Sequence, residues 1–218
     1  MKKRSVIILI LILGLVFLAG GIFAGWSFYQ KEAAKENPDI YAWITIPDTK
    51  IDYPVLQSEK DNGYYLTHDQ DGKENPSGAL FTEDYNNKDF QDPITVIYGN
   101  NMEDGSMFGE LDRYSDGRYM EEHPYIYISA DNGETTLKYR VFAAYRSDDR
   151  HIMERFQSGR SEGNRKAYLD SIFDNRVMGV QIDTSVQVNT ESRILTLSTH
   201  DDAGEEYRYL VQACLVEE

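Results

Sequence analysis

The strongest hydrophobic pattern along the chain is an apolar run near its N-terminus. Residues 6–23 are almost wholly apolar and follow three basic residues at positions 2–4. A run of 18 residues is near the lower limit for a membrane-spanning helix, and residues 24–28 can extend it. Basic residues before such a run favour a cytoplasmic N-terminus. The pattern predicts a cytoplasmic segment at 1–5 and one transmembrane helix at 6–28 in the cell membrane, with the rest of the chain outside.

A cleaved signal peptide is the alternative interpretation of this run. Its apolar region would be long for a signal peptide, and no clean A-x-A cleavage site follows it, so an uncleaved anchor is favoured. Residues 29–37 are polar and rich in alanine, glutamate and lysine, which predicts a juxtamembrane helix that ends before Pro38. One extracytoplasmic domain is then expected at 38–218.

Within this domain the apolar positions gather in short segments that are typical of strands. Expected strands lie at 41–46, 51–55, 79–82, 94–98, 125–129, 135–145, 194–199 and 207–216. Expected helices are fewer and lie at 61–69, 106–114 and 162–173, and residues 146–165 form a charged surface connection. Many short strands with few helices predict a mainly β fold, a closed or nearly closed β-barrel with a few short helices.

Three of these segments carry specific spacing signals. The helix at 106–114 is predicted from a shared face of apolar residues, Met107, Phe108, Leu111 and Tyr114. Tyr168, Leu169 and Ile172 can share one face of the helix at 162–173 in the same way. Asp131-Asn132-Gly133 is a strong turn signal between two strand-like segments, so a hairpin is expected there.

Charge and cysteine content narrow the class of protein further. The chain has 22 basic and 37 acidic residues and a net charge of −15. Three of the basic residues precede the span, which leaves the outer part with 19 against 37, a net charge of −18. Such a surface excludes nucleic acid as the expected partner, because that affinity comes largely from lysine and arginine on phosphates. Cys214 is the only cysteine, so no intramolecular disulfide can form, which fits an exported bacterial protein.

A series of short motifs in a fixed order resembles one known family. The motifs are YAWITIP at 41–47, IDYPV at 51–55, YYLTH at 64–68, GALF at 78–81, VIYG at 96–99, SMF at 106–108 and LTLST at 195–199. Together they resemble the class B sortases, the cell-surface cysteine transpeptidases of Gram-positive bacteria. The resemblance covers roughly residues 37–218 and implies a sortase-like β-barrel.

The resemblance also implies a mechanism and a set of site residues. In ordinary members a cysteine attacks a backbone carbonyl of a sorting peptide, a histidine handles protons and an arginine stabilises the oxyanion or positions the peptide. The acyl-enzyme is then passed to an amine of the cell wall. In this sequence Arg208 matches the arginine, whereas His200 stands at the cysteine position and Asn100 at the histidine position. The motifs also imply substrate-binding roles for Tyr98, Ser198 and Thr199.

The two replacements remove the chemistry that the family uses. A thiolate is both a nucleophile and a competent leaving group, whereas imidazole attacks only activated acyl groups, and an amide is not activated. Asparagine does not titrate near neutral pH, so Asn100 cannot act as general acid or base. Cys214 cannot substitute, because six residues of strand place it roughly 20 Å from Arg208. A small packed side chain is the expected role of Cys214.

Three functional hypotheses follow from this pattern. The first is a catalytically silent sortase homologue that binds a sorting-type peptide, a surface-protein or pilin tail, or an active sortase. The second is a hydrolase or transpeptidase with altered chemistry that uses His200, with a metal ion and Asp201 or Asp202, and that transfers to a cell-wall precursor if it is active. The third is an altered copy with no selected role. Since no paired-histidine ligand spacing is present, the sequence assigns no metal and no cofactor.

Several of these residues also have plain structural interpretations. Arg208 could hold a peptide carbonyl or carboxylate, or it could pair with Glu205 or Glu206. Asn100 and Asn101 also suit turn positions, because asparagine tolerates left-handed conformations. Of the other histidines, His68 and His123 are expected to be hydrogen-bonded scaffold residues, and His151 is expected at the surface.

Overall fold

A computed structural model describes residues 30–148, 161–201 and 204–217 of the protein. The segments predicted at 1–5 and 6–28, together with His151 and Asp202, therefore lie outside the described residues. Within the described ranges, none of the helices combines the length and apolar character needed to cross a membrane.

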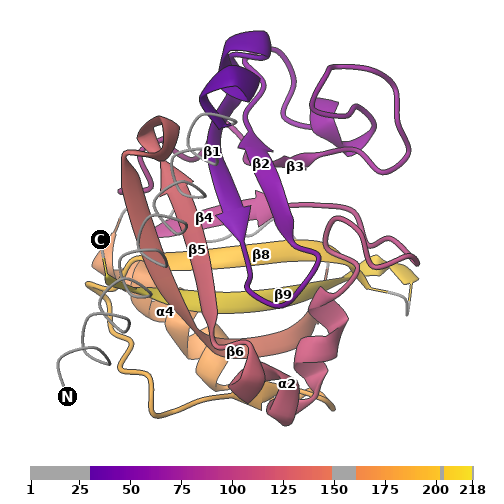
Figure 1. Cartoon of the computed structure of the whole chain (residues 1–218). Helices are drawn as coiled ribbons and strands as arrows, with labels where there is room; N and C mark the ends of the chain where they lie inside the picture. Colours follow the sequence, from indigo (N-terminus) through magenta and orange to yellow (C-terminus); the bar gives the residue numbers. More distant parts are fainter. Residues whose placement is uncertain (1–29, 149–160, 202–203, 218) are drawn as a thin grey trace, which may run out of the picture.

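The strands form one sheet that closes into a barrel (Figure 1). They are β1 (Ile40–Thr45), β2 (Asp52–Leu56), β3 (Leu80–Phe81), β4 (Ile94–Tyr98), β5 (Tyr125–Ala130), β6 (Thr135–Asp148), β7 (Gln181–Ile182), β8 (Ile194–Asp201) and β9 (Gly204–Glu217). Their order is β5-β1-β2-β3-β4-β8-β9-β6-β7. Because β5 also pairs with β6, the barrel closes and β7 remains as an extra strand beside β6. The predicted closed barrel is confirmed.

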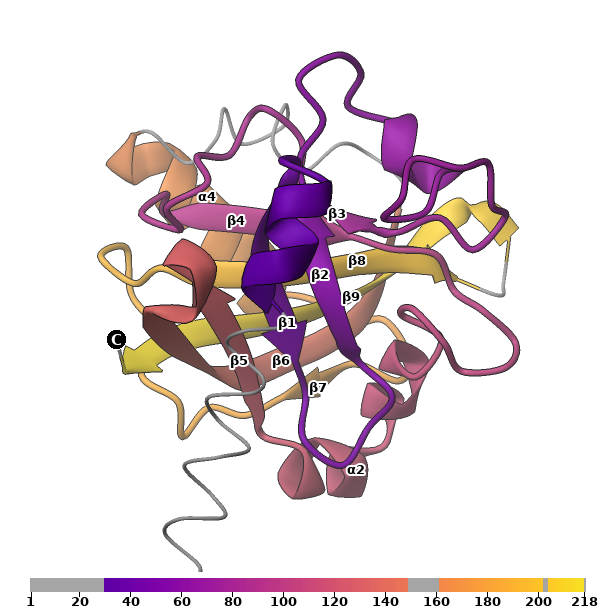
Figure 2. The same cartoon turned by 45° about the horizontal axis from the view of Figure 1, so that its top comes forward.

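The helices are short and lie outside the barrel wall (Figures 1 and 2). Within the described residues they are a helix at 30–36, the 3-10 helices η1 (Tyr64–Leu66), η2 (Leu111–Ser115) and η3 (Asp131–Gly133), and the α-helices α2 (Gly117–Glu122) and α4 (Glu162–Phe173). The helix at 30–36 and the loops around η1 gather at one end of the molecule, and α2 lies at the other. The sequence did not predict α2 or β7.

The central strands are apolar on both faces because both faces are covered. In β8, Leu195 and Leu197 point into the barrel, whereas Ile194 points outward to the cluster under α4. In β9 the same alternation separates inward Val211 from outward Leu210. Such nearly continuous apolar runs are expected wherever a strand is buried on both sides. The barrel and its helical cover therefore hold both β8 and β9 rigidly.

Most of the predicted elements are confirmed. The helix predicted at 162–173 is α4, and its buried side chains are Tyr168, Leu169 and Ile172. The predicted hairpin joins β5 to β6, and its turn places Asp131 at φ 51° and Gly133 at φ 85°. These left-handed conformations are the ones that a turn of Asp, Asn and Gly accommodates.

Three predictions were wrong in whole or part. Instead of a helix at 106–114, Met107 has φ 51° and bridges to Asn101, and η2 begins only at Leu111. The turn is very tight, since a Cβ on Gly109 would lie 2.2 Å from the Met102 carbonyl oxygen. Of the helix predicted at 61–69, only the short 3-10 helix η1 is present. The connection predicted at 146–165 overlaps the end of β6 and the start of α4.

Candidate functional site

The candidate site begins where two parallel strands end side by side. β4 and β8 pair in parallel with Tyr98 opposite Ser198, and the Gly99 N–H donates to the Ser198 carbonyl oxygen at 3.1 Å. Parallel strands bring their carboxyl ends to the same edge of a sheet. The two motifs around Asn100 and His200, about a hundred residues apart in sequence, are therefore neighbours.

The antiparallel partner of β8 supplies the arginine. Arg208 in β9 lies directly opposite His200, and its Nη1 is 3.1 Å from His200 Nδ1. A guanidinium can only donate hydrogen bonds, so Nδ1 is the acceptor and the ring proton belongs on Nε2. In this arrangement His200 is a neutral imidazole held by Arg208.

A cavity of about 190 Å³ opens at this edge of the barrel. Its lining residues are Asn62, Gly63, Leu66, Phe81, Glu83, Tyr98, Gly99, Asp148, Ser198, Thr199, His200, Arg208 and Leu210. The structure thus brings together five of the six residues that the sequence assigned to the site. Asn100 is absent from the described residues that line the cavity.

Two hydroxyl groups in this lining are shielded from solvent. Thr199 is 2% exposed, and its Oγ1 has no hydrogen-bond partner among the described residues. Tyr98 stacks on Phe81 with ring centroids 5.5 Å apart. Burial, together with the nearby charge of Glu83, raises the pKa of Tyr98 well above its ordinary value, so the phenol stays protonated. The Tyr98 phenol is thus an uncharged polar group at the cavity, whereas the Thr199 side chain lies on the barrel-interior face of β8, opposite Tyr209.

The side chain of Asn100 makes two bonds to a neighbouring loop. Its Nδ2 donates to the Leu66 carbonyl oxygen at 2.9 Å and to the Pro76 carbonyl oxygen at 3.1 Å. The next residue, Asn101, donates from its own Nδ2 to the carbonyl oxygen of His200 at 3.3 Å. At the position that the resemblance gives to a proton-transfer group, the structure has an amide bonded to backbone.

Cys214, His68 and His123, which were also considered from the sequence, lie outside the cavity and have structural roles. Cys214 is buried opposite Ile194, and burial raises the pKa of its thiol, which confirms a packed side chain. His68 Nδ1 bonds the Tyr64 carbonyl at 2.9 Å and His123 Nδ1 bonds the Pro47 carbonyl at 3.1 Å. Both histidines are therefore scaffold residues, as predicted.

The acidic candidates after His200 lie partly outside the described structure. Asp201 accepts a hydrogen bond from Arg146 Nε at 2.9 Å. Asp202 and the side chains of Glu205 and Glu206 are outside the described residues, so their suggested pairings stay predictions. Over 30–148, 161–201 and 204–217, no three His, Cys, Asp or Glu side chains cluster as metal ligands do.

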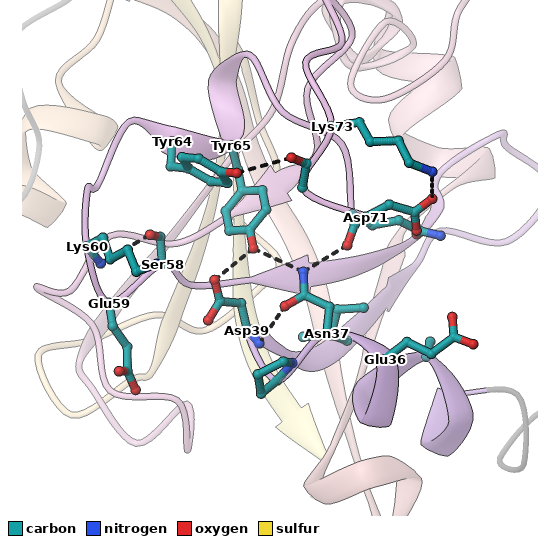
Figure 3. A pocket seen from close by; sticks show the side chains of 15 residues that line it. Glu36, Asn37, Asp39, Ser58, Glu59, Lys60, Tyr64, Tyr65, Asp71 and Lys73 are labelled. Atoms are coloured by element: carbon teal, nitrogen blue, oxygen red, sulfur yellow. Dashed lines mark hydrogen bonds and ion pairs between the residues drawn. The ribbon is translucent and has the colours of Figure 1, made fainter.

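A second hollow lies on the other side of the η1 segment (Figure 3). It is larger, about 730 Å³, and is lined by the end of the helix at 30–36, the start of β1 and residues 58–73. Its polar groups bond one another: the Tyr65 hydroxyl donates to Asp39 Oδ2 at 2.8 Å and accepts from Asn37 Nδ2 at 3.1 Å. Burial raises the pKa of Tyr65 to about 12, so it remains a donor. This hollow holds none of the predicted site residues.

Sequence reasoning missed eight of the thirteen cavity residues, among them Asn62, Leu66, Glu83 and Asp148. Asn62 and Leu66 come from the η1 segment, Glu83 follows β3, and Asp148 ends β6. These segments lie far apart along the chain. The pairing of β3, β4, β8, β9 and β6 side by side in the sheet brings them to one edge, and the local sequence does not encode that pairing.

Comparison with known proteins agrees with this fold and site. A family model described as the sortase domain matches residues 44–216, so the chain belongs to the sortase family. Sortase B of Listeria monocytogenes is 36% identical over 190 residues, which cover 85% of this chain and 73% of that protein. Sortase B of Staphylococcus aureus is 32% identical over 174 residues, covering 79% and 67%. These relatives place the chain in class B, as its motifs predicted.

A solved structure gives the same result at the level of the fold. The Staphylococcus aureus sortase B–substrate complex matches this chain with a TM-score of 0.74 at 30% sequence identity. The match covers 86% of this chain and 84% of that one. The likeness therefore extends over nearly all of the described barrel.

Proposed function

We propose that this domain binds a sorting-type peptide in the cavity beside His200 and Arg208 without cleaving it. One observation carries the proposal: both positions that need reactive groups hold groups engaged in hydrogen bonds. His200 Nδ1 accepts from Arg208, and the Asn100 amide donates to two backbone carbonyls. No thiolate stands at position 200 and no titratable group stands at position 100, so the nucleophile and the proton carrier that peptide cleavage by this family uses are both replaced.

The cavity keeps groups that can hold an extended peptide. Arg208 can donate to a peptide carbonyl or carboxylate, and Tyr98, stacked on Phe81, adds an aromatic surface to the same cavity. A relative of this chain has been solved as a sortase B–substrate complex, and we carry substrate binding over on that basis.

The proposed ligand follows from the family and the proposed location. With an anchor at 6–28 and the domain outside, the cavity would meet the tails of surface or pilin proteins. The class B resemblance suggests an Asn-Pro sequence within the peptide. An active sortase carrying such a substrate is a second source of the same peptide.

Peptide binding tests the proposal directly. We expect the full chain in detergent to bind a fluorescein-labelled peptide with an Asn-Pro pair, measured by fluorescence polarisation, and to leave it uncleaved by mass spectrometry. Arg208→Ala should weaken binding roughly 10- to 100-fold, since a hydrogen bond to a charged group is worth about 1.5–3 kcal/mol. Arg118→Ala is the matched control, because Arg118 pairs with Glu122 on the surface of α2.

Two outcomes would contradict silent binding. Absence of peptide binding by the unaltered chain would contradict the proposed function. Cleavage that disappears in His200→Ala would instead assign altered chemistry, and a stoichiometric metal ion lost in the same variant would make that chemistry metal-assisted.

A further inference from the structure

Consecutive asparagines tie the end of β4 to two different walls of the cavity. Asn100 bonds the backbone of Leu66, and Leu66 lines the cavity on the η1 side. Asn101 bonds the backbone of His200, which lines the cavity on the β8 side. The two side chains therefore connect one rigid strand end to both walls between which a ligand would lie.

The Leu66 side chain itself adds little apolar packing to this wall, because it is 40% exposed. The adjoining Tyr65 is buried and bonds Asp39 and Asn37, which holds the other side of η1. The loop after it is closed by its own backbone bonds, Asn75 N–H to the Thr67 carbonyl at 2.8 Å and Ala79 N–H to the Tyr65 carbonyl at 2.9 Å. These bonds shape the loop but do not join it to the end of β4. The two bonds from Asn100, to residues 66 and 76, make that join.

Asn100 is itself held firmly in place. It follows Gly99, whose N–H bonds Ser198, and its own carbonyl accepts from the Phe108 N–H at 3.0 Å. Gly99 is packed so tightly that a Cβ there would lie 2.3 Å from the Leu80 side chain. A donor on a fixed backbone can fix the loop that it binds, because the donor itself has little conformational freedom left to lose.

We propose that Asn100 and Asn101 are positioning residues that keep the peptide cavity preformed, Asn100 by holding the Leu66 wall and Asn101 by holding the end of β8. The inference rests on the proposed peptide binding for its functional meaning. Preformed walls raise affinity because the ordering cost is met before the ligand arrives. A histidine at position 100 could not do the same, since a neutral imidazole has one N–H and two carbonyls must be bonded.

Hydrogen exchange of the full chain in detergent, without peptide, tests the positioning role by itself. In Asn100→Ala we expect amides at 67–79 to exchange about tenfold faster, which corresponds to about 1.4 kcal/mol of lost local stability. In Asn100→His, which keeps one side-chain N–H, the exchange rate at 67–79 should lie between those of the unaltered chain and Asn100→Ala. Asn101→Ala should speed exchange at 199–201 and leave 67–79 unchanged.

The matched control is Asn86→Ala. Asn86 also bonds two backbone groups, the Ile94 carbonyl at 2.7 Å and the Val96 N–H at 3.0 Å, but at the opposite end of β4. We expect this variant to lower overall stability while exchange at 67–79 and peptide affinity, both measured below its unfolding transition, stay as in the unaltered chain.

Peptide affinity, measured on the same variants, completes the test. Asn100→Ala should bind the Asn-Pro peptide several-fold more weakly, and Asn100→His should recover part of the loss. Unchanged exchange at 67–79 in Asn100→Ala would overturn the positioning role whatever the unaltered chain binds. Faster exchange with unchanged affinity would overturn its part in binding. Faster exchange in Asn100→Ala, together with an unaltered chain that binds no peptide, would support the positioning role of Asn100 but contradict the proposed function.

Discussion

The identity of two side chains decides what chemistry this barrel can perform. At position 200 an imidazole stands where the family resemblance places a thiol, and its Nδ1 accepts a hydrogen bond from Arg208. At position 100 an amide stands where the resemblance places a titratable ring, and it bonds backbone. Both replacements can be read directly from the sequence. The hydrogen bonds that His200 and Asn100 make cannot, because their partners lie 8 to 34 residues away along the chain.

Restoring both reactive groups should restore some cleavage. We expect the double variant Asn100→His with His200→Cys to cleave the Asn-Pro peptide detectably by mass spectrometry, because Arg208 and Tyr98 already line the cavity. Each single variant should stay inactive, since the nucleophile and the proton carrier act as a unit. The rate should remain low because the introduced imidazole would give up one of the two bonds that hold the loop. A folded double variant without activity would show that the cavity no longer has working geometry.

Two threonines of one strand differ in whether their buried hydroxyl groups have hydrogen-bond partners. Thr196 and Thr199 both lie in β8 and are both buried. Thr196 Oγ1 bonds Gln212 Oε1 and the Tyr168 hydroxyl, each at 2.7 Å, whereas Thr199 Oγ1 has no partner among the described residues. Three positions place the two side chains on opposite faces of the strand, with Thr196 on the α4 side and Thr199 on the barrel-interior side, opposite Tyr209.

The same substitution should therefore have different effects at these two sites. We expect Thr196→Val to lower the free energy of unfolding by about 1–2 kcal/mol, because it breaks a satisfied buried network. Thr199→Val should change it by less than about 0.5 kcal/mol, or raise it, since a buried hydroxyl without a partner is replaced by an apolar group of the same shape. Urea unfolding measures both, and equal losses would contradict the assignment.

Element prediction succeeded where local pattern and local structure coincide. The spacing of Tyr168, Leu169 and Ile172 identified α4, and Asp131-Asn132-Gly133 identified the hairpin. The helix expected at 106–114 failed although its apolar spacing was suitable. There the chain must turn tightly beside β4, and Met107 in a left-handed conformation interrupts any helix.

At the scale of the whole molecule, the barrel is in close contact with the helix at 30–36 that precedes it. The helix at 30–36 is docked through Gln30, which accepts from the Ser129 hydroxyl at 2.9 Å, and through Ala33 and Ala34, which pack on the cluster around Tyr65. The predicted anchor ends at residue 28. If the anchor is retained, almost no linker separates the membrane from the barrel, which would hold the domain near the membrane surface.

Membrane extraction tests the predicted anchor. We expect the full chain expressed in a Gram-positive host to stay in the membrane pellet after an alkaline carbonate wash, because about 20 apolar residues insert essentially irreversibly. Protease added to intact protoplasts should degrade the domain, since the basic N-terminus favours an outside C-terminus. A variant that begins at residue 29 serves as the control and should be absent from the pellet. Release of the full chain by the wash, or secretion of a shortened chain, would support a cleaved signal peptide instead.

The sequence by itself determined the family, the mainly β class, the position of most strands and the replacement of both reactive groups, because these depend on short-range patterns and residue types. Only the tertiary structure decided which groups meet. The parallel pairing of β4 with β8 brings Asn100 and Asn101 beside His200, and the pairing of β3 with β4 adds Leu66 and Glu83 to the same cavity. Such contacts join segments tens of residues apart, and their free energy depends on strand register and burial, which no local pattern encodes.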